Sequence, residues 1–479
     1  MAFDPARLHR MLNPRSIVVV GDKAPNYGWL TRQKEFPGPV LSVQVDPKEV
    51  EAIEGLGFTN YSSLAEVPGD IDLVICAVPR QITPMVIGQA VERGVGGVSM
   101  FTSGFSETED PDAIEMERKI YEAATGDGMP IVGPNCLGIY NRELGLKFSD
   151  DQLVGDGGTV AIAGQSGTNT SGMVSGMQRM GVKVRRAVSF GNALIVNECD
   201  YLEYYANDPD VEVIVMYIEG VRDGRRFLQL LRETTPKKPV VLWHGGRTPA
   251  GAKAIKSHTS SLASSVAVWD AMVAQTGAIG TATMEETIDV TAALTHTERP
   301  SGRGMALIGM NGGQAVALTD QFSSLGFAVP SLSEESYAQL AEFFVAVGSS
   351  YRNPFDAAST IRSEDENLEK ILDIIASDDA IDGGVAIELG ARDFDEDPAS
   401  IDRILDLLDR YRGRTGHPAI TLMHDNGGGE GGVEAMVRAR AHVAGRGFAA
   451  FQSYSRGAIA LDRVVSHIEA VAGMGRGAS

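Results

Sequence analysis

The chain has 479 residues, of which 43% are hydrophobic and 22% are charged, as is usual for a globular protein. At about 150 residues per domain, this length exceeds what one hydrophobic core usually supports and predicts about three domains. The formal net charge of −21 disfavours bulk attraction to nucleic acid or an anionic membrane, so we expect neither as a partner.

The compartment can be predicted from the cysteines and from the absence of a targeting pattern. No apolar run approaches the ~18 residues of a membrane-spanning helix, and residues 1–14 lack the apolar core of a signal peptide. Cys76, Cys136 and Cys199 form no CxxC pair, which argues against a disulfide framework or a zinc site. We therefore expect a cytoplasmic protein without a metal site.

Short apolar runs alternate along the whole chain with helical patterns, such as those at 83–93 and 112–125. The runs that predict strands lie at 16–20, 40–45, 73–78, 97–101, 130–132, 159–163, 184–190, 211–218, 239–243, 305–308, 385–389 and 419–423. Near-continuous apolar strands separated by helices predict parallel sheets covered on both faces. The Pro- and Gly-rich segment 297–304 predicts a linker. We thus expect an α/β fold with domains at 1–147, 148–299 and 300–479.

The first strand–helix turn is compatible with two interpretations. Gly21 is followed by the next glycine only at Gly28, which departs from the GxGxxG spacing of dinucleotide sites. Such a glycine still lets backbone N–H groups approach an anion, but a plain turn explains it equally. After the second strand, Asp46 could bind a ribose, or Lys48 could meet a phosphate of a nucleotide such as coenzyme A.

Two further loops each follow a predicted strand. In the loop 133–141 (GPNCLGIYN), Asn135 offers a donor and an acceptor, whereas Cys136 has no basic neighbour and packing is the favoured interpretation. The turn 164–172 (GQSGTNTSG) leads from a strand into a helix and predicts a phosphate cradle at the helix N-terminus. It is neither a Walker loop nor a nucleophile elbow, and ordinary capping by Ser166 or Thr168 is the alternative.

A histidine and an acid complete the candidate chemistry. His258 lies among small residues in KSHTSSLASS, which would leave an exposed, mobile imidazole suited to group transfer, although by context alone an ordinary structural histidine is the favoured interpretation. Glu219 ends the strand of the segment VIVMYIEG and could orient that imidazole, as carboxylates commonly do.

The order of these motifs resembles the nucleoside-diphosphate-forming acyl-CoA synthetases, the superfamily of ADP-forming acetate–CoA ligase and succinyl-CoA synthetase. The segments that carry the resemblance are GPNCLGIYN at 133–141, GQSGTNTSG at 164–172, YIEGVRDGRRF at 217–227, GGRTPAGAKAIKSHTSSLAS at 245–264 and NGGQAVALTD at 311–320. The resemblance to the α subunit implies a Rossmann-like CoA-binding domain followed by two flavodoxin-like ligase domains. The family's ATP-grasp domains are missing from this chain.

The resemblance also implies roles for individual residues. His258 matches the phosphorylated histidine, Glu219 matches the acid that steadies it, and Asn135 and Cys136 lie in the loop lining the acyl site. The residues matching the phosphate-binding turn are Gln165, Ser166, Gly167, Thr168 and Asn169. The residues in loops that meet coenzyme A are Gly21, Lys48, Thr102, Ser103 and Gly104.

The implied reaction joins a small carboxylic acid to coenzyme A at the expense of ATP, through phosphohistidine and an acyl phosphate, releasing ADP and phosphate. An ATP-grasp β subunit is the implied partner in a hetero-oligomer, and it would bind ATP or ADP with Mg²⁺. Two departures concern the phosphate chemistry. Ser260 and Ser264 replace glycines of the family's histidine loop, and Asp22 with Lys23 replaces a small pair after Gly21.

Two other functions stay open. A non-catalytic CoA- or acyl-CoA-binding regulatory protein of the same fold would explain Ser260 and Ser264, although His258 and Glu219 oppose it. An NAD-dependent oxidoreductase lacks its GxGxxG turn and leaves the motifs of the middle third unexplained. The sequence does not specify the carboxylic acid, nor ATP over GTP.

Overall fold

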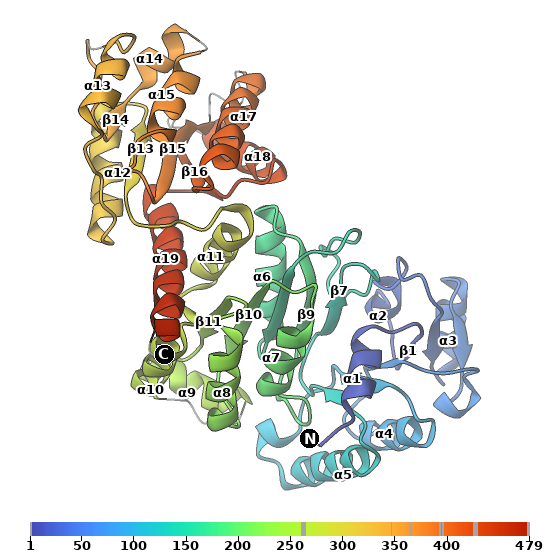
Figure 1. Cartoon of the computed structure of the whole chain (residues 1–479). Helices are drawn as coiled ribbons and strands as arrows, with labels where there is room; N and C mark the ends of the chain where they lie inside the picture. The colour runs from blue at the N-terminus through green and yellow to red at the C-terminus, as the bar shows by residue number, and fades with distance from the viewer. Residues whose placement is uncertain are drawn as a thin grey trace. The chain divides into compact units, whose positions relative to one another are not determined.

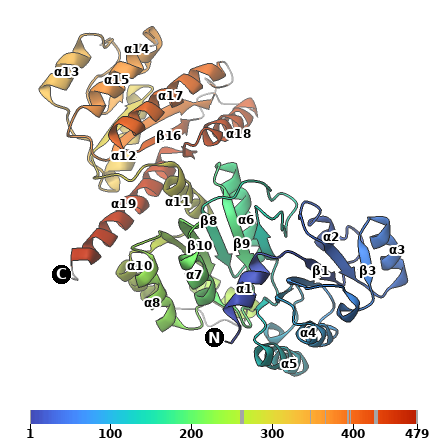
Figure 2. The same cartoon turned by 45° about the vertical axis from the view of Figure 1, so that its right-hand side comes forward.

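The computed structural model describes residues 2–259, 265–345, 347–364, 366–391, 394, 397–424 and 430–476. The side chains of 256–259, 424, 430, 431, 475 and 476 also lie outside the description. Three sheets organise the chain, and Figures 1 and 2 show the helices around them. Close contacts group the chain into two compact units, residues 1–178 with 183–284 and residues 179–182 with 285–479.

The first sheet has six parallel strands in the order β3-β2-β1-β4-β5-β6, the strand order of a Rossmann fold. Its strands are β1 (Ile17–Val20), β2 (Val40–Val43), β3 (Thr59–Tyr61), β4 (Leu73–Cys76), β5 (Gly97–Met100) and β6 (Ile131–Val132). Its helices are α1 (Pro5–Leu12), α2 (Gly28–Thr31), α3 (Pro47–Gly55), α4 (Thr83–Glu92) and α5 (Pro111–Asp127). The order reverses between β1 and β4, where such folds bind ligands.

Local sequence explains where these helices begin and end. The Asp110 side chain accepts the Asp112 N–H, and Pro111 supplies the fixed φ that suits a first helical residue, so α5 begins there. Gly128, at φ +72°, ends the same helix in the left-handed region. The predicted helices at 83–93 and 112–125 are thereby confirmed within a few residues.

The second sheet has the order β12-β11-β10-β8-β9-β7, and all its neighbours are parallel except the pair β7 and β9. Its strands are β7 (Gly138–Asn141), β8 (Val160–Gly164), β9 (Val184–Ser189), β10 (Val213–Ile218), β11 (Val240–His244) and β12 (Ile279–Thr281). Its helices are α6 (Gly167–Arg179), α7 (Glu198–Asn207), α8 (Gly224–Thr234), α9 (Pro249–Thr259) and α10 (Val266–Thr276). From β8 onwards this is the flavodoxin-like order, with β7 added at the edge.

The third sheet, β14-β13-β15-β16-β17, repeats the flavodoxin-like order with parallel neighbours. Its strands are β13 (Met305–Gly309), β14 (Phe355–Asp356), β15 (Gly384–Gly390), β16 (Ala419–His424) and β17 (Ala450–Phe451). The helices of this unit are α11 (Met284–His296), α12 (Gly312–Ser324), α13 (Glu334–Ala341), α14 (Ala358–Ser363), α15 (Asn367–Ala376), α17 (Pro398–Thr415), α18 (Glu430–Gly445) and α19 (Tyr454–Arg476).

The predicted fold class, a Rossmann-like unit followed by two flavodoxin-like units, is confirmed by the three strand orders. The domain boundaries at 147 and 299 stay a proposal. Strand β7 lies before the first boundary yet pairs with β9 of the second sheet, and α11 lies before the second boundary yet groups mainly with the third sheet.

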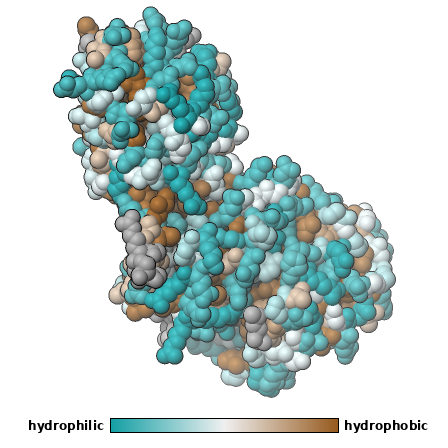
Figure 3. All heavy atoms as spheres, viewed as in Figure 1, coloured by the Kyte–Doolittle hydropathy of each residue, from teal (hydrophilic) through white to brown (hydrophobic). Residues whose placement is uncertain are grey.

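The surface fits the composition. On the face drawn in Figure 3, hydrophilic side chains cover most of the molecule and hydrophobic ones are scattered. Among the described residues, no helix is both long enough and apolar enough to span a membrane.

Candidate active site

The predicted phosphate turn, the predicted acid and the helix containing His258 follow strands β8, β10 and β11. These three strands are parallel neighbours, so the segments that follow them emerge at one edge of the second sheet. The sequence prediction that these segments act together therefore has a structural basis, since one edge brings them together.

Gln165 fastens the loop after β8 to the loop after β10. Its side-chain oxygen accepts the backbone N–H groups of Glu219 and Gly220, the latter at 3.0 Å. Its own backbone N–H donates to the Tyr217 carbonyl at 3.1 Å. Gln165 is buried, so this residue of the predicted phosphate turn holds the acid-bearing loop in place.

The first turn of α6 presents free donors. Ser166 caps the helix, because its hydroxyl accepts the Asn169 N–H at 3.3 Å, as the capping alternative expected. Among the described residues, nothing accepts the backbone N–H groups of Gly167 and Thr168. Two free N–H groups at the positive end of a helix form a suitable site for a phosphate.

Glu219 presents one unused carboxylate oxygen. Its Oε1 accepts the Tyr217 hydroxyl at 3.1 Å. The whole residue is only 8% exposed, and its Oε2 is buried without a hydrogen-bond partner among the described residues. A buried oxygen of this kind calls for a donor, because leaving it unpaired costs about 1–3 kcal/mol.

His258 belongs to the backbone of α9, but its side chain lies outside the described residues, as do Ser260 and Ser264. The approach of its imidazole to Glu219 thus stays a prediction. The start of the segment that leads to it is tightly packed. Gly246 has φ +72°, and a Cβ there would lie 2.4 Å from Ile255 Cδ1, so only glycine fits.

In the first sheet, Gly21 lies where the strand order reverses. Its φ is +85°, and a Cβ would lie 2.4 Å from Val78 Cγ1, so only glycine lets the turns after β1 and β4 come this close. The loops and helices that follow β2, β4 and β5 carry exposed apolar side chains. These are Val45, which is 72% exposed, Met85, which is 57% exposed, Ile82 and Phe101.

Of the other residues predicted to bind coenzyme A, some are exposed and some form hydrogen bonds within the protein. Lys48, in the first turn of α3, and Ser103 are exposed. The Thr102 hydroxyl instead donates to the Val78 carbonyl at 2.7 Å. Gly104, at φ +94°, donates its N–H to Glu107 at 2.6 Å and accepts from Arg80 at 2.7 Å.

Asp22 faces the protein interior. Its carboxylate accepts the N–H groups of Leu30 at 2.8 Å and Lys23 at 3.0 Å, and it is 4% exposed. Burial raises the pKa of Asp22 above its usual value, against the opposing effect of these hydrogen bonds. This acid therefore fixes the turn into α2 and does not face a phosphate bound outside that turn.

The loop 133–141 is tied to the coenzyme A loop through residues that the sequence did not reveal. Asn135, at φ +57°, donates its N–H to Thr102 and its amide to Asn192 Oδ1 at 3.4 Å. Asn192 in turn donates to Glu107 Oε2 at 2.9 Å. Asn192 lies in the loop after β9, Glu107 lies in a short 3-10 helix (Ser106–Thr108) after β5, and no motif marks either of them.

Cys136 packs in the interior of the first unit. Its thiol donates to the Met100 carbonyl at 3.3 Å, and burial raises its pKa to about 12. A thiol this difficult to ionise is a poor nucleophile, which supports the packing interpretation. Tyr217, which contacts Glu219, is the other residue of this region that sequence analysis did not single out.

Comparison with known proteins decides the family. Residues 15–142 match the CoA binding domain model, and residues 157–294 match the succinyl-CoA ligase like flavodoxin domain model. Over 363 residues the chain is 32% identical to subunit alpha of acetate–CoA ligase [ADP-forming] II from Pyrococcus furiosus, covering 75% of this chain and 78% of that protein. The chain belongs to the ADP-forming acyl-CoA ligases.

Other relatives of this ligase chain are longer. Acetate–CoA ligase [ADP-forming] I of Archaeoglobus fulgidus is 32% identical over 384 residues, 77% of this chain but 55% of that protein. The chain thus spans about half the length of some curated relatives. Among solved structures, PH0766 from Pyrococcus horikoshii OT3 matches with a TM-score of 0.80 and 25% identity, covering 97% of this chain and 99% of that one.

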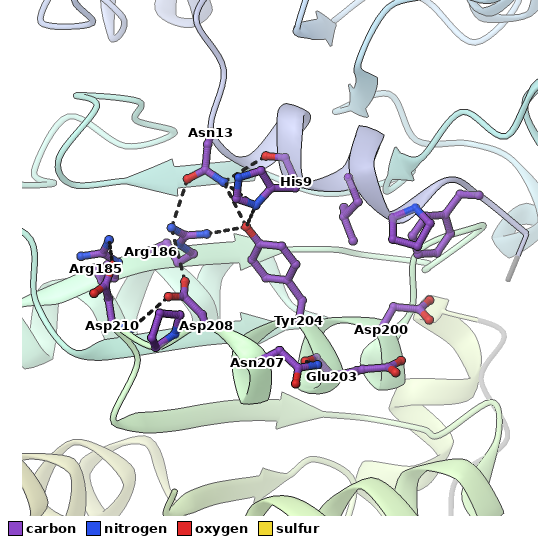
Figure 4. A pocket seen from close by; sticks show the side chains of 14 residues that line it. His9, Asn13, Arg185, Arg186, Asp200, Glu203, Tyr204, Asn207, Asp208 and Asp210 are labelled. Carbon is purple, nitrogen blue, oxygen red and sulfur yellow. Dashed lines mark hydrogen bonds and ion pairs between the residues drawn. The ribbon is translucent and has the colours of Figure 1, made fainter.

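A cavity of about 520 Å³ in the first unit of the ligase chain lies apart from all predicted site residues. Figure 4 shows His9 of α1 and Asn13, which caps the end of that helix, converging with Arg186 of β9 on the Tyr204 hydroxyl, with Asp208 beside Arg186. Arg185 pairs with Asp210 at 2.6 Å in the same wall. The arginines of this cavity are already paired with aspartates, so the cavity offers little positive charge to a phosphate. The edge of the second sheet where β8, β10 and β11 end is the better candidate for the active site.

Proposed function

We propose that the chain is the α-type part of an acid–CoA ligase that converts a carboxylic acid, coenzyme A and ATP into acyl-CoA, ADP and phosphate. One observation carries this proposal. The free N–H groups at the start of α6 and the unpaired Oε2 of Glu219 lie on adjacent loops that Gln165 holds together. The first suits a phosphoryl group, and the second suits the N–H of a cationic imidazole.

The reaction needs an activation step because a carboxylate oxygen is a poor leaving group. A carboxylate cannot acylate a thiol until one of its oxygens carries a leaving group. In our proposal, a carboxylate oxygen attacks the phosphorus of phosphorylated His258, and the P–N bond breaks. The thiolate of coenzyme A then attacks the carbonyl carbon, the C–O bond to phosphate breaks, and free phosphate leaves.

This chain's residues have distinct tasks in that sequence. Neutral imidazole is a good nucleophile and, once phosphorylated, a good leaving group. Glu219 Oε2 would accept the N–H of the nitrogen that is not phosphorylated and stabilise the positive charge on the ring. The N–H groups of Gly167 and Thr168 would hold the phosphate oxygens, as donors fixed in place before reaction.

We propose that coenzyme A binds at the turn that contains Gly21. The turn lies where the strand order of the first sheet reverses, as ligand sites of such folds do, and exposed Lys48 and Ser103 can meet the charge of a pyrophosphate. The exposed apolar side chains Val45, Met85, Ile82 and Phe101 suit the apolar parts of the molecule. The loop of Asn135 and Asn192, joined to Gly104 through Glu107, would line the acyl group.

A second chain or domain must supply the nucleotide. The sequence has no Walker lysine and no kinase-type loop, and we propose an ATP-grasp β subunit, which would bind ATP or ADP with Mg²⁺. The naming of Pyrococcus furiosus relatives as alpha subunits supports a hetero-oligomer. Acetate and 4-hydroxybutyrate, named in relatives from Archaeoglobus fulgidus and Nitrosopumilus maritimus, are the first acids to test.

Labelling with ATP tests this function. The chain, mixed with its ATP-grasp partner and γ-³²P-ATP, should become an acid-labile, alkali-stable phosphoprotein, and His258→Ala should abolish the label. His9→Ala, which changes an exposed histidine in the same unit, is the control and should keep it. Label that persists in His258→Ala would refute the assignment. Coenzyme A binding without any phosphorylation would instead favour the regulatory protein.

A further inference from the structure

Tyr217 lies near the end of β10 (Val213–Ile218), and Glu219 follows directly after that strand. Its hydroxyl donates to Glu219 Oε1 at 3.1 Å. Asn169, in the first turn of α6, lies near the same hydroxyl and acts against the rise in its pKa. The Tyr217 hydroxyl thus lies between the predicted phosphate turn and Glu219.

The surroundings of Tyr217 hold its ring in one place. The ring packs against Trp243 of the neighbouring strand, with a centroid distance of 4.5 Å. Gly245 follows that strand, and a Cβ there would lie 2.6 Å from the Tyr217 hydroxyl oxygen. A glycine at 245 therefore leaves the space that the hydroxyl occupies. Burial, and then Glu219, raise the pKa of Tyr217, so the hydroxyl stays protonated as a donor.

The contact has a consequence for Glu219. A carboxylate whose Oε1 is engaged by a fixed donor has one orientation, and its Oε2 is the oxygen left over. That oxygen is buried and has no partner among the described residues. If both oxygens were unrestrained, the carboxylate could rotate, and the geometry of a bound imidazole would be lost.

We propose that Tyr217 is a positioning residue for phosphoryl transfer, whose hydroxyl orients Glu219 so that Oε2 accepts the N–H of the phosphoryl-carrying imidazole. Tyr217 neither gains nor loses a proton in this role and touches no reacting atom. The inference rests on the proposed function, since it presupposes that an imidazole carries the phosphoryl group next to Glu219.

A double-mutant cycle separates this role from a merely structural one. The initial rate of phosphorylation from acetyl-CoA and ³²P-phosphate is measured in wild type, Tyr217→Phe, Glu219→Gln and the double variant. We expect Tyr217→Phe to lower the maximal rate about tenfold, the effect of about one hydrogen bond, with unchanged half-saturating phosphate. Glu219→Gln should cost on the order of 10²-fold. In that background, removal of the Tyr217 hydroxyl should change the rate less than twofold, as expected of coupled residues.

Two further variants keep the test independent of folding defects. Tyr205→Phe removes another buried hydroxyl of this unit, one that donates to the Ile162 carbonyl at 3.1 Å, and should leave the rate unchanged. Gly245→Ala should slow the reaction by crowding the Tyr217 hydroxyl. In the Tyr217→Phe background the same change should slow the reaction by a smaller factor, because the nearest crowded atom, the hydroxyl oxygen, is gone and the next contacts are at 3.1 and 3.3 Å.

The outcomes distinguish the inference from the function on which it rests. Wild-type labelling with an unchanged rate in Tyr217→Phe overturns the positioning role alone. Equal slowing by Tyr217→Phe in the wild-type and Glu219→Gln backgrounds overturns it as well, because the tyrosine would then act without Glu219. Absence of labelling at His258 in the wild type overturns the proposed function, and the inference falls with it.

Discussion

At the residue scale, the candidate site depends on how single side chains place their charges and on which hydrogen-bonding groups they leave free. Glu219 keeps one buried oxygen free, Ser166 caps α6 without engaging the first two N–H groups, and Asp22 turns its charge inward. The Glu219 oxygen and the two N–H groups lack the partners that polar groups need, and the inward-facing charge of Asp22 is kept away from a bound anion. The arrangement therefore fits a region built to receive a phosphate and a cationic ring.

Gly21 allows a prediction with a matched control. Gly21→Ala places a Cβ 2.4 Å from Val78 at φ +85°, whereas Gly57→Ala meets nothing within 4 Å at nearly the same φ, +89°. Both should lose about 1 kcal/mol of unfolding free energy from the left-handed backbone. Gly21→Ala should lose more, because of the clash, and should weaken coenzyme A binding at least tenfold.

Denaturant unfolding and calorimetric titration with coenzyme A measure the two effects. Gly57→Ala should bind coenzyme A as the wild type does. Equal affinity in Gly21→Ala and wild type would mean that the turn after β1 is a plain connection and that coenzyme A binds elsewhere.

At the element scale, the proposed phosphate site lies where two loops are joined. The loop after β8 leads into α6 and the loop after β10 carries Glu219, and Gln165 is the side chain that connects them. The sequence predicted both loops, because each follows an apolar run at 159–163 or 211–218. The sequence could not predict that Gln165 connects the two loops, since a glutamine after a strand does not reveal which N–H groups will donate to its side chain.

Gln165→Ala tests that connection. It leaves the N–H groups of Glu219 and Gly220 without their acceptor, so the unfolding free energy should fall by about 2 kcal/mol and phosphorylation of His258 should slow at least tenfold. Gln33→Ala is the matched control, because buried Gln33 also bridges separate backbone segments, with its oxygen on the Lys147 N–H at 3.0 Å. It should lose similar stability without slowing the labelling. Equal rates in the two variants would assign Gln165 a structural role alone.

At the scale of the whole molecule, strand orders were more predictable than contacts. Runs of apolar residues separated by helices limit the choice to a few parallel topologies, which is why three α/β units could be expected. The antiparallel β7 at the edge of the second sheet was not predicted, because no local signal states which sheet a short strand joins. Asn192 and Glu107 likewise meet Asn135 and Gly104 only once separate loops have folded together.

The proposed division of labour between this chain and a nucleotide-binding partner also belongs to the scale of the whole molecule. Acyl-CoA and phosphate involve no nucleotide, so the chain by itself should carry out the reverse half-reaction that ends in phosphohistidine. Formation of ATP from that intermediate requires a site for ADP, which we assign to the partner. The two halves of the reaction can therefore be separated by leaving the partner out.

The most direct measurement is the labelling of the purified chain with acetyl-CoA and ³²P-phosphate, repeated with 4-hydroxybutyryl-CoA, before and after ADP is added. We predict acid-labile label that depends on His258, with release of coenzyme A, and no ATP until the ATP-grasp partner joins the mixture. ATP formed by the chain alone would contradict the two-part account. Label that survives His258→Ala would contradict the phosphohistidine itself.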